Sequence, residues 1–218
     1  CRHNSSTVTD ADAATYSTTG KLMSIKDSKT DQPPLKINRR TALGLGVVTT
    51  IALPMAAVAQ PPARQKPQAG DFLVFEEGPN QGEVVRPELL QLDQRPVSAL
   101  ARDPATDTLR NGSRLNRVMI TRIDAEKLTA RYQRHVAGGV IAYSIVCTHT
   151  GCDVTNWDSD ALLMACPCHE SQFDIYAGGS VVGGPALRPL AILPLTVNNG
   201  EVMVAASFSG KVGFSQQF

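Results

Sequence analysis

The sequence lacks a strong excess of charge of either sign. Its 218 residues carry 21 lysines and arginines against 20 aspartates and glutamates, and seven of the basic residues precede residue 60. The rest of the chain, with 14 basic and 16 acidic side chains, is close to neutral. A nucleic-acid-binding domain usually has a strongly basic face. The feature of this sequence most similar to such a face is a group of four arginines, which we interpret as a solvated edge: Arg110, Arg114, Arg117 and Arg122. We therefore expect no nucleic-acid partner.

Helical periodicity, internal repeats and the usual catalytic signatures are also scarce. The sequence offers no separate nucleophile, acid/base pair or phosphate-binding loop, so it does not indicate a stand-alone catalyst of bond breaking. If the protein is part of an enzyme, we expect it to be one subunit of an oxidoreductase.

What the sequence does contain is a series of short β segments separated by turn residues, which predicts an all-β, antiparallel fold. Asn199-Gly200, between two apolar runs, predicts a hairpin with a type I′ turn. One helical turn is expected over Asp124 to Leu128. Examples of the expected strands are residues 72–75, 118–123, 140–146, 162–166 and 193–197.

The first 59 residues differ from the rest and predict targeting rather than folding. Residues 1–22 are rich in Ser and Thr, and we interpret them as an upstream extension or a disordered tail. Residues 23–59 pass through Arg39-Arg40 into an uncharged stretch, 41–59, which resembles a twin-arginine export signal ending in Ala57-Val58-Ala59. The alternative is that residues 41–59 are retained as a membrane anchor.

Either interpretation puts the folded domain in the bacterial periplasm, free or attached to the inner membrane. Residues 60–70 contain three prolines and no apolar cluster, so they predict an extended tether. The folded domain is expected to comprise residues 71–218.

The chemistry of the chain is concentrated in two short segments, each with two cysteines and one histidine. They read Cys147-Thr148-His149-Thr150-Gly151-Cys152 and Cys166-Pro167-Cys168-His169-Glu170-Ser171. Six candidate ligands are too many for one tetrahedral zinc, and the usual zinc spacings are not matched. A dithiol redox site would prefer a Cys-x-x-Cys pair, which is absent, and would leave both histidines unexplained. A non-redox zinc or disulfide module nevertheless stays open as an alternative.

The two segments closely resemble the Rieske iron–sulfur proteins of cytochrome bc complexes and their relatives. Those proteins carry Cys-x-His-x-Gly-Cys and Cys-Pro-Cys-His-x-Ser in the same order. The resemblance implies one [2Fe–2S] cluster per chain, with thiolates on one iron and imidazoles on the other. The implied ligands are Cys147, Cys166, His149 and His169.

The same resemblance implies a disulfide between Cys152 and Cys168, which Rieske ferredoxins and ring-hydroxylating oxygenases typically lack. It implies a Rieske-type antiparallel β domain with an inserted cluster-binding subdomain at about residues 147–185. Ser171 stands where the family places a serine that donates to a bridging sulfide. The loop Gly183-Gly184-Pro185 matches the proline-containing loop that covers the cluster. Phe173 replaces a tyrosine of the high-potential members, so we expect a lower midpoint potential.

For function, the resemblance implies one-electron transfer as a periplasmic carrier or a redox-enzyme subunit. The alternative is the iron–sulfur subunit of a cytochrome bc-type complex, which requires a retained anchor and a mobile tether. Thr150 and Glu170 replace the leucine and glycine usual in that family, and Thr150 puts quinol docking in doubt. The implied partners are cytochrome c, cytochrome b with quinol, or the large subunit of a molybdenum enzyme, with membrane association through residues 41–59.

Overall fold

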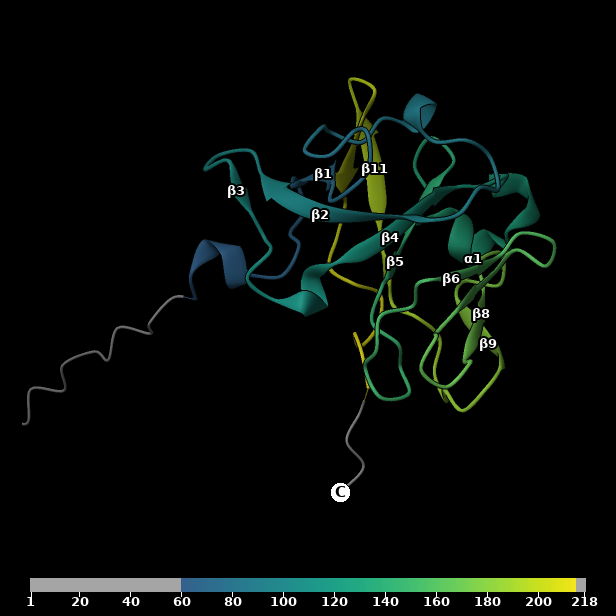
Figure 1. Cartoon of the computed structure of the whole chain (residues 1–218). Helices are drawn as coiled ribbons and strands as arrows, with labels where there is room; N and C mark the ends of the chain where they lie inside the picture. Colours follow the sequence, from purple (N-terminus) through teal and green to yellow (C-terminus); the bar gives the residue numbers. More distant parts are fainter. Residues whose placement is uncertain (1–59, 215–218) are drawn as a thin grey trace, which may run out of the picture. The chain divides into compact units, whose positions relative to one another are not determined.

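The computed structural model describes residues 60–214, so the predictions for residues 1–59 lie outside the described part of the chain. The described residues are almost entirely β structure and turns (Figure 1). Their one α-helix, α1, spans Ala130–Gln133. Within residues 60–214, no helix is long and apolar enough to cross a bilayer.

The larger of two sheets is antiparallel and nearly closes on itself. Its strands follow the order β10-β5-β4-β2-β1-β12-β11, with β3 paired only to β2. The edge strands β10 and β11 are consecutive in the chain and are separated by Pro194 alone. The strands are β1 (Phe72–Phe75), β2 (Val97–Asp103), β3 (Thr108–Leu109), β4 (Val118–Arg122), β5 (Val140–Ser144), β10 (Ile192–Leu193), β11 (Leu195–Asn198) and β12 (Glu201–Val204).

The smaller sheet is an insertion between two neighbouring strands of the larger one. It contains β6 (Asn156–Asp158), β7 (Leu163–Ala165), β8 (Gln172–Asp174) and β9 (Ser180–Gly183), paired in that order. The chain leaves the larger sheet after β5 and returns at β10, and these two strands pair with each other. The insertion therefore begins and ends at one place (Figure 1).

The strand β5 is buried on both faces because it lies between two apolar clusters. Side chains alternate across a strand, so Val140 and Ala142 face the interior of the larger sheet, whereas Ile141 and Tyr143 pack toward the insertion. Phe173 of β8 and Ile175, directly after β8, belong to the same cluster as Tyr143. The insertion is thus fixed to the larger sheet by a shared core.

Four of the five expected strands are present, with ends that differ by at most two residues, whereas β2, β3, β6, β8 and β9 were not named among the expected strands. The expected strand at 193–197 is divided, because Pro194 has no N–H to donate to a ladder. Asn199 and Gly200, both with positive φ (51° and 80°), form the predicted hairpin turn between β11 and β12. The predicted helical turn is the 3-10 segment Ala125–Lys127.

The Pro-rich segment, for which the sequence predicts an extended tether, is hydrogen-bonded to the domain. A 3-10 turn spans Pro62–Arg64, and the backbone N–H of Gly112 donates to the Ala63 carbonyl at 2.8 Å. The Asn116 amide donates to the Gln65 carbonyl at 2.7 Å. Residues 62–70 are therefore attached to the larger sheet.

The predicted solvated edge is wrong for Arg110. Its side chain is 2% exposed and forms an ion pair with the equally buried Asp71. The guanidinium also donates to the Pro62 carbonyl at 3.3 Å and to the Gln65 side chain at 3.1 Å. The arginine is buried because these acceptors satisfy its charge and its donors.

Candidate metal centre

Two ligand loops of the same backbone design lie side by side at one end of the insertion. In the first, the Cys147 N–H donates to the Cys152 carbonyl at 2.8 Å and the Gly151 N–H returns to the Cys147 carbonyl at 3.1 Å. In the second, the Cys166 N–H donates to the Ser171 carbonyl and the Glu170 N–H donates to the Cys166 carbonyl, both at 2.9 Å. The fifth residue of each loop has positive φ, at 86° for Gly151 and 58° for Glu170. Each loop is therefore a tight turn that begins with a cysteine.

These first cysteines, Cys147 and Cys166, are free thiols and are both 1% exposed. Burial raises the pKa of the Cys147 thiol, because the charged thiolate loses hydration. The backbone N–H of His149 and the Ser171 hydroxyl act in the opposite direction, since they donate to the sulfur. Both sulfurs are thus buried, and the Cys147 sulfur already has hydrogen-bond donors that favour its negative charge.

The two predicted histidine ligands face each other. The ring centroids of His149 and His169 are 4.6 Å apart, edge to face. The Nδ1 atom of His149 is buried and has no hydrogen-bond partner, although a buried polar nitrogen normally has one. His169 is exposed. The first ring therefore has a lone pair available for a ligand, and the second reaches the surface.

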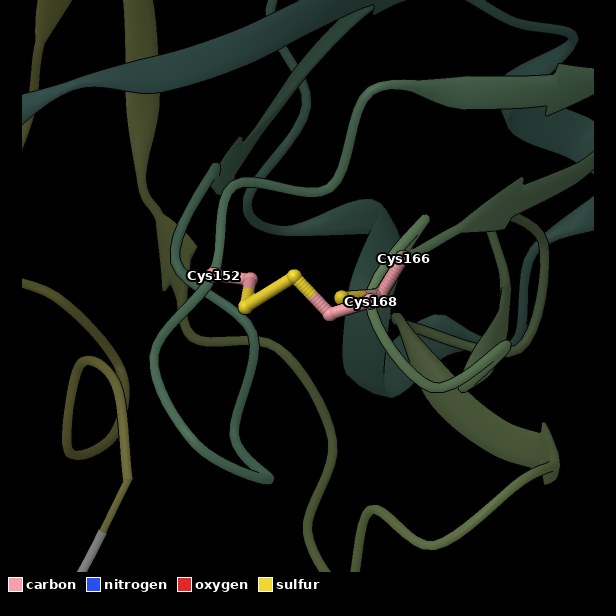
Figure 2. A group of neighbouring side chains, drawn as sticks. All are labelled: Cys152, Cys166 and Cys168. Atoms are coloured by element: carbon pink, nitrogen blue, oxygen red, sulfur yellow. A yellow bond between two sulfur atoms is a disulfide. The ribbon is translucent and has the colours of Figure 1, made fainter.

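The remaining two cysteines join the loops covalently, as the resemblance implied. Cys152 and Cys168 form a disulfide with their Cα atoms 6.6 Å apart. Figure 2 shows this bridge between the two loops, with Cys166 beside Cys168. The sulfurs of these three residues lie within 4.8 Å of one another. Because two of them are bonded together, they do not form a three-thiolate metal site. Among the described residues 60–214, only Cys147 and Cys166 retain thiols.

The third predicted segment, Gly183-Gly184-Pro185, packs against the second ligand loop, and we call it the covering segment. Gly184 has a φ of 77°, and a Cβ there would lie 2.5 Å from the Cα of Ser171 and 2.7 Å from the Glu170 carbonyl. The Ala186 N–H donates to the Ser171 hydroxyl at 3.2 Å. Ser171 is fully buried. Glycine at position 184 therefore permits a backbone approach that any side chain would prevent.

Sequence reasoning missed the charged side chains that hold the first loop. Arg114 donates to the Gly151 carbonyl and to one carboxylate oxygen of Asp153, the residue directly after the loop. Arg117 donates to the other oxygen of Asp153 at 2.7 Å and also to Glu76 at 2.8 Å. These ion pairs could not be recognised in the sequence, because the partners are far apart in the chain: Arg117 and Asp153 are separated by 36 positions.

The donor set fits a metal centre with mixed sulfur and nitrogen ligation. Two disulfide-linked loops carry two buried thiols and a buried imidazole nitrogen without a partner. A Rieske [2Fe–2S] centre takes two thiolates and two imidazoles, and the described loops offer that number of each. Residues 60–214 contain no other free thiol, so such a centre would use every free thiol of the described chain.

Comparison with known proteins agrees with this geometry. Residues 105–194 match the family model described as the Rieske [2Fe-2S] domain. The chain is 45% identical over 80 residues to a putative respiratory nitrate reductase Rieske subunit of Haloferax mediterranei, covering 36% of each chain. It is 39% identical over 115 residues to a cytochrome bc1 complex Rieske iron-sulfur subunit of Corynebacterium glutamicum, covering 48% of this chain and 28% of that one.

Among solved structures, a cyanobacterial plasma membrane Rieske protein from Synechocystis is similar, with 26% identity and a TM-score of 0.33 over 50% of this chain and 86% of that one. The chain spans about a quarter to a third of the length of the first curated relatives it matches. The matched region, residues 105–194, contains both ligand loops and the covering segment. The chain therefore contains a Rieske [2Fe-2S] domain, which implies one [2Fe–2S] cluster per chain.

Proposed function

We propose that this chain carries single electrons through one Rieske cluster bound by two thiolates and two imidazoles. The ligands in this proposal are Cys147, Cys166, His149 and His169. The observation that carries it is a pair of disulfide-linked loops that each carry one buried thiol and one of two facing imidazoles, of which the His149 ring has a buried Nδ1 without a partner. When bound, the cluster supplies a one-electron couple, and neutral imidazoles raise its potential above that of an all-thiolate cluster.

The chain's own residues determine how that couple is held and reached. The disulfide keeps the two loops together, and the covering segment excludes water from the side of Ser171. His169, being exposed, gives the redox centre an edge at the protein surface. Phe173 is fully buried and has no hydroxyl to donate, which supports a potential below that of tyrosine-bearing relatives.

For the physiological setting, we propose a periplasmic carrier or a subunit of a redox enzyme. The attachment of residues 62–70 to the domain supports this, because a bc-type subunit requires a mobile tether. The relative named as a nitrate reductase subunit points the same way. The bc1 relatives support the second candidate, an iron–sulfur subunit of a quinol-oxidising complex.

The test is EPR spectroscopy of the dithionite-reduced protein, purified from an export-competent bacterial host, with a redox titration on the same sample. We expect a rhombic [2Fe–2S] signal and a midpoint within the Rieske range of about −150 to +300 mV. Cys147→Ser should abolish the signal, whereas Thr150→Ser, an exposed change in the same loop, should keep it. A colourless protein with stoichiometric zinc would refute the proposal.

A further inference from the structure

A groove of about 210 Å³ lies beside α1, where this helix approaches residues 188–192 and 209–211. Its cationic lining residues are Arg131, Arg188 and Lys211, and no acidic residue lines it. None of the three forms an ion pair within the described residues. We call this feature the basic groove.

The positive charge of the basic groove is local. Elsewhere in the domain Arg110, Arg114 and Arg117 are each paired with carboxylates, and the chain after residue 59 has slightly more acidic than basic residues. Beside the groove, the pKa of His135 is lowered by its burial and then by the charges of Arg134 and Arg131. Around α1, three cations thus line one groove without an acidic neighbour in its lining.

The basic groove is joined directly to the first ligand loop. The Thr148 hydroxyl, next to His149, donates to the Arg188 carbonyl at 2.6 Å. The Arg188 guanidinium in turn donates to the carbonyls of Lys211 and Gly213, which fixes its charge in place. Because Arg188 also follows the covering segment closely in the chain, the cations lie at the flank of the proposed redox centre.

An exposed apolar side chain is the chain neighbour of a residue that lines the basic groove. Leu187, directly before Arg188, is 83% exposed. Protein interfaces combine apolar contacts with arginine and a polar rim, whereas a site for a small free anion has no use for an exposed leucine. This combination favours a macromolecular partner over a dissolved ion.

We propose that the basic groove docks an acidic face of the protein that exchanges electrons with this domain. The inference rests on the proposed function and adds the charge of the partner surface. Carboxylates of the partner would lie against Arg131 and Lys211, and complementary charge would raise the rate of productive encounter.

The test compares holoprotein variants in which groove charge is removed. Arg131→Gln with Lys211→Gln removes two exposed cations, while Arg188 is kept because its guanidinium holds two carbonyls. The matched control is Arg64→Gln with Arg86→Gln, which removes two exposed cations that do not line the basic groove. EPR first establishes cluster content, so a sample without a cluster counts against the proposed function and not against the groove.

The readout is the stopped-flow oxidation rate of the reduced cluster by ferricyanide, an anion, and by tris(phenanthroline)cobalt(III), a cation. At low ionic strength we expect the double variant to react about three- to tenfold more slowly with ferricyanide, and no more slowly with the cobalt complex. The difference should shrink in about 1 M salt, where the Debye length is near 3 Å. Equal ferricyanide rates for the double variant and the control with Arg64→Gln and Arg86→Gln would overturn the proposal.

A competitor separates a protein surface from a free-anion site. Poly-L-glutamate should slow the ferricyanide reaction of the unaltered protein at low ionic strength and have little effect on the double variant. Orthophosphate at the same concentration of negative charge should slow the ferricyanide reaction far less. If phosphate slows the reaction as much as the polymer does, the groove is a site for small anions and the docking proposal fails.

Discussion

Glu170 has, in the second ligand loop, the place that Gly151 has in the first. Each residue donates its N–H to the carbonyl of the cysteine that begins its loop, and each has positive φ. For Gly151 this conformation carries no penalty, because glycine lacks a Cβ. For Glu170 it costs about 1–2 kcal/mol. A glycine at this position would avoid that strain.

Glu170→Gly should therefore stabilise the domain. The gain is reduced by the greater freedom of glycine in the unfolded chain, so we expect about 1 kcal/mol or less and a melting temperature higher by roughly 2–4 °C. Thermal unfolding of the holoprotein followed by circular dichroism measures the change. Glu170→Ala removes the same charge but keeps a Cβ, so it should show no such gain. Equal effects of the two variants would mean that charge, and not backbone strain, decides the result.

At the scale of elements, the covering segment and the second ligand loop depend on the absence of one side chain. The close contacts of Gly184 involve backbone atoms of Ser171 and Glu170, which cannot rotate away. The Ala186 N–H to Ser171 hydroxyl bond lies in the same contact. A displacement of the segment would therefore also expose Ser171.

Gly184→Ala should displace the covering segment and speed the loss of the cluster. Overpacking typically costs about 1–3 kcal/mol, and the positive φ adds strain. The control is Gly200→Ala, which has a similar φ of 80° but no atom within 4 Å of the added Cβ. Decay of visible cluster absorbance in the presence of a chelator gives the rate. The prediction fails if the two variants lose the cluster equally fast.

A second contact between elements joins the insertion to the larger sheet. The Tyr176 hydroxyl, just after β8, donates to the Asp93 carboxylate and accepts the backbone N–H of Asp124 at 3.1 Å. The ammonium of Lys127 lies 5.6 Å from the ring centroid. Burial, and then the hydrogen bond to Asp93, raise the pKa of Tyr176 to about 12.

This contact should make stability depend on alkaline pH. The pKa of Tyr176 in the folded protein lies above the ordinary value of 10.0. Its contribution to the free energy of unfolding is therefore fully present below pH 10 and is lost as pH rises through about 12. Urea unfolding at several pH values between 8 and 11 should give a decline in the free energy of unfolding. Tyr176→Phe should be less stable at pH 8 and should decline less steeply. Parallel curves for the two proteins would contradict the assignment of this slope to Tyr176.

At the scale of the molecule, the predictable part of the structure is the part that is local in sequence. The ligand loops could be recognised because their cysteines and histidines follow one another within six residues, and Asn199-Gly200 identified its hairpin for the same reason. The disulfide followed from the family pattern. The helix α1 was missed because four residues are too few to show a helical period.

The contacts that hold the parts together could not be predicted in this way. Tyr176 and Asp93 are 83 positions apart, and Arg110 and Asp71 are 39 apart. Pairing across such distances depends on the order and register of strands, which the composition of a single segment does not encode. The arginines near residue 110 therefore looked like a solvated edge, although the structure buries Arg110 completely.

The pair Asp71–Arg110 fastens the Pro-rich segment to the larger sheet. Arg110 donates from two nitrogens to the two oxygens of Asp71, and its third nitrogen reaches Pro62 and Gln65. Both side chains are almost fully buried. One partner without the other would leave an unpaired group in the interior, although Asp103, 3.6 Å from Arg110, offers a weaker alternative.

Asp71→Asn should lower the free energy of unfolding by about 3–5 kcal/mol, the usual effect of leaving one buried charge without its partner. Urea unfolding at pH 7 followed by far-UV circular dichroism measures it. The control is Asp107→Asn, whose carboxylate is 86% exposed and pairs with Arg102, so its effect should stay below about 1 kcal/mol. In the Asp71 variant, proteolysis should also cut residues 62–70 faster, because they would lose their attachment. A loss no larger than that of the control would mean that Asp103 replaces Asp71, and the segment would then stay attached.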